Sequence, residues 1–299
     1  MGEYILHGVS RADRFKNRFV KTALLIRGSK KLFSSEKAAD EYLEKIRDEN
    51  FNLRLEETFA CNVEKRKFLD TEYAVFEPKG EKSATTVFYL HGGAYVRHIT
   101  KLHLKMLDRL CERTKARIVA PCYLTAPKYD FHQSAEQLIG IYHKETLKSE
   151  KIIISADSCG AAIGVCLLEP ISNRGLKMPE KAVFFSPLLS HGLSEKKEFE
   201  SDPMFGGTEG LARFAESWSN GSNAADPMKI NFSLLPKTYI FTSKCDMLHE
   251  GCLDFFKKAE ENNADVTLEM WNEMYHVFVL YPLSASKEVF ETAVGLIIR

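Results

Sequence analysis

One serine in the sequence stands where a strand is expected to turn sharply into a helix. KIIIS (151–155) is a short β-branched run typical of a buried strand, and SCGAAIGVCLL (158–168) is typical of a helix. Ser158 lies between them, with the small residues Ala156 two positions before it and Gly160 two positions after it. This is the context of a nucleophile elbow, in which a tight turn presents the hydroxyl above the sheet. The same pattern also suits an ordinary serine N-cap.

A glycine pair follows a second predicted strand. TTVFYL (85–90) runs directly into HGGA (91–94), and two glycines allow neighbouring backbone N–H groups to point toward one place. Converging N–H groups stabilise the oxyanion of an acyl-transfer reaction, and the N–H after the nucleophile completes such a set. The predicted oxyanion hole therefore consists of Gly92, Gly93, Ala94 and Cys159. A phosphate-binding loop is excluded, because neither GxxxxGK[ST] nor GxGxxG occurs here.

Together the two motifs resemble those of the hormone-sensitive-lipase-like branch of the α/β-hydrolases. That branch carries an HGG[G/A] loop and a GDSAG elbow, followed along the chain by an aspartate and a histidine. Here the loop is HGGA and the elbow is ADSCG (156–160). Ala156 replaces the first glycine of the family motif and is still small, and Cys159 replaces the alanine and need offer only its N–H. A further family marker, YRLAPE, is YLTAPK (123–128) in this chain and lacks its acidic residue. The resemblance covers roughly residues 60–290.

The resemblance implies a catalytic triad of Ser158, Asp246 and His276. His276 matches the late His-x-Phe position and would take the Ser158 proton as general base. Asp246 would hold the imidazole tautomer and stabilise the imidazolium, with Glu250 as the competing carboxylate. In the family the aspartate at position 157 is structural. His91 is expected to brace the oxyanion loop. The remaining histidines are predicted to be surface or capping residues: His98, His103, His132, His143, His191 and His249.

Short apolar strands alternate with amphipathic helices along most of the chain. The predicted strands span 55–63, 67–76, 85–90, 116–121, 151–155, 182–186, 238–242 and 266–271. The first two are expected to form a hairpin around Glu64-Lys65-Arg66. One predicted helix begins at Thr100, and the others span 132–147, 158–168, 249–262 and 284–298. This alternation favours a mostly parallel sheet of about eight strands with helices on both faces. The resemblance makes it an α/β-hydrolase fold.

Two segments lie outside the alternation. The first fifty residues are predicted to be helical, and 190–230 is an insertion with its own amphipathic helix. We expect one domain over 1–299, with cap elements from 1–50 and 190–230 that cover the carboxyl end of the sheet. Five side chains are candidates for the acyl side of the pocket, with burial in the cap as the alternative: Tyr95, Met204, Phe205, Phe214 and Trp218.

Composition restricts the partners. The 41 basic and 41 acidic side chains balance, which argues against nucleic acid and against a polybasic membrane surface. We expect no membrane span, because no apolar run approaches about 18 residues, and no signal peptide. Seven cysteines without a CxxC pair indicate reduced thiols and a cytoplasmic protein. No zinc-ligand spacing occurs, so we expect no metal and no cofactor.

These observations lead to a serine carboxylesterase that hydrolyses small to medium acyl esters through an acyl-Ser158 intermediate. Its expected partners are a small-molecule ester and water, and a homodimer is left open. Two alternatives use the same fold. One is a non-catalytic ligand-binding protein, and the other is a serine amidase or peptidase with the same nucleophile.

Overall fold

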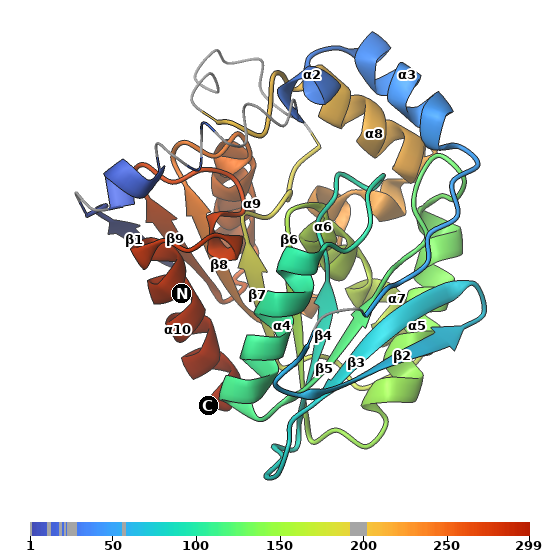
Figure 1. Ribbon diagram of the computed structural model, residues 1–299, viewed down its shortest axis with the longest axis vertical. Helices are drawn as coiled ribbons and strands as arrows, with labels where there is room; N and C mark the ends of the chain where they lie inside the picture. The colour runs from blue at the N-terminus through green and yellow to red at the C-terminus, as the bar shows by residue number, and fades with distance from the viewer. Residues whose placement is uncertain are drawn as a thin grey trace.

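A mostly parallel sheet runs through the middle of the computed structural model, which describes residues 2–10, 13–17, 20, 22, 29–55, 58–191 and 202–299 (Figure 1). The described residues contain nine strands in the order β1-β9-β8-β7-β6-β4-β5-β3-β2. Only β3 pairs in antiparallel fashion, with β2 and with β5. The strands are β1 (Glu3–His7), β2 (Asn62–Phe68), β3 (Thr71–Glu77), β4 (Thr85–Leu90), β5 (Arg117–Pro121), β6 (Lys151–Asp157), β7 (Lys181–Phe185), β8 (Lys237–Ser243) and β9 (Val266–Trp271).

The hairpin between β2 and β3 lies further along the chain than predicted. Its turn is at Leu69-Asp70, and Leu69 has a positive φ of 50°. Glu64, Lys65 and Arg66 lie inside β2, although their charges suggested a turn. Within this edge strand Arg66 forms an ion pair with the buried Glu145 at 3.1 Å, a partner from α5 that the local sequence does not indicate.

The first strand, β1, contradicts the prediction that the first fifty residues are helical. Residues 3–7 pair in parallel with β9, so their partner lies at the far end of the chain. The Tyr4 hydroxyl donates to Met270 Sδ at 3.6 Å, and the His7 ring stacks on Trp271 with centroids 4.2 Å apart. Because these partners are distant in sequence, local periodicity carries no signal for this strand.

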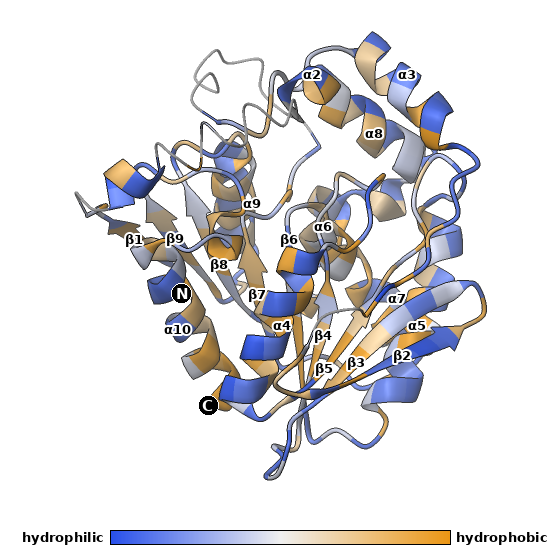
Figure 2. Cartoon of the chain, viewed as in Figure 1, coloured by the Kyte–Doolittle hydropathy of each residue, from blue (hydrophilic) through white to orange (hydrophobic). Residues whose placement is uncertain are grey.

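Helices cover both faces of the sheet, as predicted. Figure 1 shows α4 and α10 in front of the sheet, and the other long helices pack on the opposite face. In Figure 2 the strands between these layers are predominantly hydrophobic, while the helices are hydrophilic on their outer sides. The helices are α4 (Lys101–Thr114), α5 (Phe131–Thr146), α6 (Cys159–Cys166), α7 (Leu168–Asn173), α9 (His249–Glu261) and α10 (Ser284–Ile298).

Three further helices, α2 (Ser29–Phe33), α3 (Glu36–Ile46) and α8 (Glu209–Ser219), lie together above the carboxyl ends of the central strands (Figure 1). The ring of Phe33 meets Phe205 and Phe214 edge to face at 4.9 and 5.8 Å. Residues 23–28 and 192–201 of the two predicted cap segments lie outside the described residues.

Short 3-10 helices complete the structure: η2 (Asn223–Ala225), η3 (Pro227–Lys229), η4 (Phe232–Leu234) and η5 (Phe278–Leu280). None of the helices that the structure describes has the length and apolarity needed to cross a membrane.

Candidate active site

Ser158 occupies the turn between β6 and α6. Its φ of 51° and ψ of −127° are unusual for a residue with a side chain, as expected of a strained turn. The turn is held from both sides: Ser158 N–H donates to Phe185 O at 3.0 Å, and Leu188 N–H donates to Ser158 O at 2.9 Å. A Cβ at Gly160 would lie only 2.1 Å from Leu90 O, so the close approach of helix and strand requires glycine there. The Ser158 hydroxyl makes no capping hydrogen bond to α6, which argues against the N-cap interpretation.

The structure brings Ser158, His276 and Asp246 into one line. His276 Nε2 lies 3.0 Å from Ser158 Oγ, and His276 Nδ1 lies 3.1 Å from both carboxylate oxygens of Asp246. Asp246 follows β8 and His276 follows β9, and parallel strands carry their carboxyl ends to one edge of the sheet. A proton on Nδ1 directed at Asp246 leaves Nε2 free to accept the serine proton. Glu250 lies in the first turn of α9, and Asp246 is the carboxylate in contact with the imidazole.

Burial and charge oppose one another at His276. Burial by itself lowers the pKa of this imidazole, but the charge of Asp246 and its hydrogen bond outweigh burial and hold the pKa above its ordinary value. Asp246 is completely buried, so water screens its charge little. The imidazole can therefore hold a proton taken from Ser158, as a general base must.

The glycine-rich loop between β4 and α4 differs from the prediction at one position. Gly92 N–H donates to Asp157 Oδ1 at 2.9 Å, so it is not available to an oxyanion. Glycine is required at 92 for a different reason, because a Cβ there would lie 2.2 Å from Asp157 Oδ2. The remaining predicted donors are the N–H groups of Gly93, Ala94 and Cys159. The loop turns through positive φ at Gly93, Ala94 and Tyr95, with values of 143°, 53° and 66°.

Asp157 connects this loop to its surroundings. Its carboxylate accepts from the Tyr89 hydroxyl at 2.6 Å and lies 3.4 Å from His103 Nε2. Burial raises the pKa of Asp157, but His103 and the hydrogen bonds outweigh burial and hold the pKa below its ordinary value. His103 caps α4 with Thr100, as predicted for a capping histidine, but it is also buried against Asp157. The carboxylate thus joins β4, the glycine-rich loop and α4.

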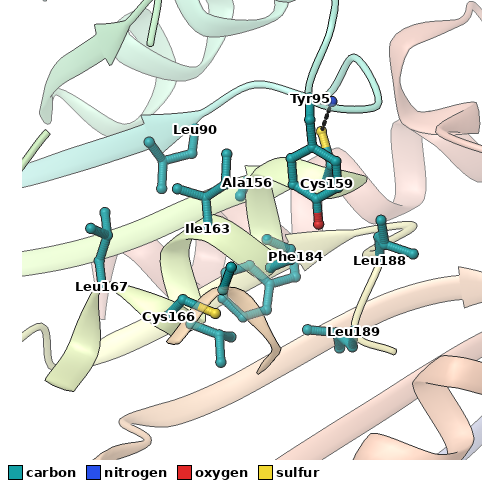
Figure 3. Close-up of a cluster of buried hydrophobic side chains, with 14 of the residues drawn as sticks. Leu90, Tyr95, Ala156, Cys159, Ile163, Cys166, Leu167, Phe184, Leu188 and Leu189 are labelled. Carbon is teal, nitrogen blue, oxygen red and sulfur yellow. Dashed lines mark hydrogen bonds between the residues drawn. The ribbon is translucent and has the colours of Figure 1, made fainter. Parts of the chain in front are cut away.

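The side chain of Cys159 supports the same loop, which the sequence analysis did not predict. Figure 3 shows the Tyr95 N–H directed at Cys159 Sγ, a distance of 3.3 Å, within a cluster of buried apolar side chains. The Tyr123 hydroxyl lies 3.5 Å from the same sulfur. Burial raises the pKa of Cys159 to about 11, so the thiol is protonated at neutral pH. The sulfur is therefore a neutral acceptor that holds the strained Tyr95 backbone.

His91 braces the loop from its other side, in agreement with the expectation. Its Nδ1 lies 2.7 Å from Gly92 O, and its ring stacks on Tyr123 at 4.3 Å. Burial lowers the pKa of His91 to about 3, so the imidazole is neutral and Nδ1 can donate to the carbonyl. The loop is therefore held by contacts on several sides before any substrate arrives.

A cavity of about 680 Å³ opens above Ser158. Met204 and Phe205 line it, as predicted, and the Phe205 ring lies 4.8 Å from the His276 ring. Further lining comes from residues that the sequence did not single out: Phe33, Arg97, Lys101, Leu102, Leu280 and Tyr281. They come from three segments that are far apart in the chain, around positions 33, 97–102 and 280–281, so no single local motif marks them.

Three of the five predicted pocket side chains lie elsewhere. Tyr95, Phe214 and Trp218 are fully buried and are not among the residues that line the cavity. Tyr95 stacks on Trp218 at 5.4 Å, and Phe214 packs against Phe33 of α2. They follow the alternative of burial in the cap, because large rings gain most from complete removal from water.

The sequence analysis also missed Asp202. This carboxylate is completely buried and accepts a hydrogen bond from the backbone N–H of His276. Its Asp-Pro step is an ordinary turn signal, and nothing in the local sequence indicates that the carboxylate is buried.

Comparisons with known proteins agree with the fold. The alpha/beta hydrolase fold family matches residues 87–280. An acetyl-hydrolase of Streptomyces hygroscopicus is 26% identical and covers 66% of this chain and 69% of its own. An esterase of Acinetobacter venetianus is 25% identical, with 69% and 71% covered. The crystal structure of the hormone-sensitive-lipase homologue EstE7 from a metagenome library has a TM-score of 0.74 at 20% identity, with 95% and 99% covered. The chain belongs to the α/β-hydrolase fold family, in its hormone-sensitive-lipase-like branch.

Proposed function

We propose that this protein is a serine carboxylesterase that hydrolyses small to medium acyl esters through an acyl-Ser158 intermediate. The observation that carries the proposal is the line of hydrogen bonds from Asp246 through His276 to Ser158 on the floor of a cavity. Relatives described as an esterase and an acetyl-hydrolase support the same chemistry. An intact nucleophile and base argue against a ligand-binding protein without catalysis.

In the proposed mechanism His276 Nε2 takes the Ser158 proton as Oγ attacks the ester carbonyl carbon. The resulting oxyanion faces the N–H groups of Gly93, Ala94 and Cys159, and the imidazolium is stabilised by Asp246. Collapse of this intermediate expels the alcohol, which takes its proton from His276 and leaves acyl-Ser158. Water then attacks the acyl carbon with His276 again as base, and the carboxylic acid is released.

The cavity walls suggest the size of the acyl group. Phe33, Met204, Phe205 and Leu280 form an apolar lining above the nucleophile. A volume of about 680 Å³ lies within the ordinary range of small-molecule sites. We also propose that α2, α3 and α8 act as the cap of a single domain, because Phe33 and Phe205 bring two of its segments to the cavity.

A series of p-nitrophenyl esters from acetyl to dodecanoyl tests the function. We expect kcat/KM to be highest for short and medium acyl groups and to fall for dodecanoyl, since the long chain exceeds the apolar lining. The matched p-nitroanilides should react more slowly, because the amine is the poorer leaving group. No activity on acetate or butyrate would favour the ligand-binding alternative, and faster anilide cleavage would favour an amidase.

The Cys159 side chain provides a separate test of the oxyanion loop. We expect Cys159→Ala to lower kcat about tenfold, because an unpaired buried N–H at Tyr95 costs roughly 1–3 kcal/mol. Cys159→Ser keeps an acceptor and should lose less. Iodoacetamide should leave the wild-type rate unchanged, since the thiol is protonated and buried. Rapid alkylation of Cys159 itself, located by mass spectrometry and distinguished from alkylation of the half-buried Cys245, would contradict this description of the sulfur.

A further inference from the structure

A second buried carboxylate lies beside the proposed triad. Asp202 Oδ1 accepts from the Met204 N–H at 2.9 Å. Asp202 Oδ2 accepts from the N–H groups of Met247 and His276, at 3.3 Å each. One side chain thus joins three segments: the wall of the cavity, the turn that carries Asp246, and the loop that carries His276.

The backbone of His276 is held on both sides. Asp202 binds the N–H of His276 itself, and Ser186 Oγ accepts from the next N–H, that of Val277, at 2.9 Å. Val277 has a positive φ of 51°, which is rare for a β-branched residue, so the loop is strained at this point. Such a conformation persists only when its surroundings hold it. Asp202 and Ser186 supply two of those contacts.

The charge of Asp202 also acts on the imidazole. The ionisable groups that influence Asp202 and His276 are Asp246, Asp157 and Tyr275, together with the pair itself. Burial and the charge of Asp246 raise the pKa of Asp202 to about 6, although His276 and the N–H groups of Met204 and Met247 oppose this rise. When ionised, Asp202 adds to Asp246 in holding the pKa of His276 up.

We infer that Asp202 is a positioning residue that fixes the backbone of His276 to the cavity wall and places a second buried carboxylate beside it. The inference rests on the proposed function, since it concerns the same histidine. Met204 and Phe205 lie two and three positions after Asp202, so the wall that would contact the acyl group and the base that would activate Ser158 share one anchor. Asp202 is not among the residues that line the cavity, and it acts on the site through the backbone of Met204, Met247 and His276.

Three substitutions separate the charge of Asp202 from its geometry. Asp202→Asn and Asp202→Ser remove the charge, whereas Asp202→Glu keeps it and displaces the oxygens. The matched control is Glu209→Gln, which removes an exposed negative charge from α8 without touching His276. The readouts are kcat/KM for p-nitrophenyl acetate and the rate of fluorophosphonate labelling, each as a function of pH.

We expect Asp202→Asn and Asp202→Ser to move the acid limb of both profiles to lower pH by roughly half to one unit. Their rates at the plateau should fall about 10- to 100-fold, because the imidazole is displaced from Ser158. Asp202→Glu should keep the acid limb of the wild type and lose rate. Glu209→Gln should match the wild type in both respects.

An acid limb that stays at the wild-type position in both neutral variants would overturn the inference, as would an equal shift in Glu209→Gln. If Asp202→Asn fails to fold, Asp202→Ser and Asp202→Glu decide by the same criterion. A wild-type protein that is neither labelled nor active would instead overturn the proposed function, and this inference with it. If the wild type is labelled, but the acid limb of the pH profile does not move in the variants, the role of Asp202 is overturned and the proposed function is not.

Discussion

Replacement of Ser158 by alanine should lower kcat/KM for p-nitrophenyl esters by a factor on the order of 10⁴ to 10⁶. Ser158 Oγ lies 3.0 Å from Nε2 of His276, the proposed base, and its loss would remove the proposed covalent step. The oxyanion donors and the cavity would remain, so we expect a residual rate above that of water alone. A stopped spectrophotometric assay of p-nitrophenolate release measures this loss.

The matched control for this variant is Ser155→Ala. Ser155 lies on β6, the strand that ends just before Ser158, it is also buried, and its hydroxyl has no hydrogen-bond partner among the described residues. We expect this variant to retain activity and to react with a fluorophosphonate probe as the wild type does. Labelling of Ser158→Ala by the probe would show that another residue is the nucleophile.

Replacement of Asp246 by asparagine should lower kcat by a factor on the order of 10⁴. An amide at this position can donate to Nδ1, which favours the tautomer with its proton on Nε2 and blocks transfer from Ser158. The charge that raises the pKa of His276 is also lost, so any residual activity should extend to lower pH. Steady-state kinetics as a function of pH measure both effects.

Glu250→Gln tests the choice between the two carboxylates. Glu250 lies on α9, whereas Asp246 is within hydrogen-bond distance of His276. We therefore expect Glu250→Gln to remain within a few fold of the wild type. A larger loss in Glu250→Gln than in Asp246→Asn would mean that the acid of the triad has been assigned to the wrong residue.

The residues that the structure brings together around Ser158 were predictable because each follows a strand. Ser158, Asp246 and His276 stand just after apolar runs, and parallel strands end at one edge of a sheet. The HGGA loop follows another of these strands. A strong apolar run flanked by small residues is a local signal, so the sequence predicted most of the central strands and their helices, and the family resemblance supplied the chain order of the site.

The register and edges of the sheet depended on partners far away in the chain. β1 pairs with β9, and the β2 hairpin turns at Leu69, with the charged Arg66 inside β2 and in an ion pair with Glu145 of α5. Neither kind of contact appears in a window of neighbouring residues. Local patterns therefore predicted about eight strands and placed one turn too early.

Only the tertiary structure decided what each polar group near Ser158 contacts. It directs the Gly92 N–H to Asp157, the Tyr95 N–H to Cys159 Sγ, and the His276 N–H to Asp202. It also decided which aromatic rings reach the cavity and which pack in the cap. The sequence by itself predicted the elbow serine and the glycine-rich loop from strand ends, and the family resemblance implied Asp246 and His276. Their distances and charges came from folding, because the partners of a buried polar atom are set by packing between distant segments.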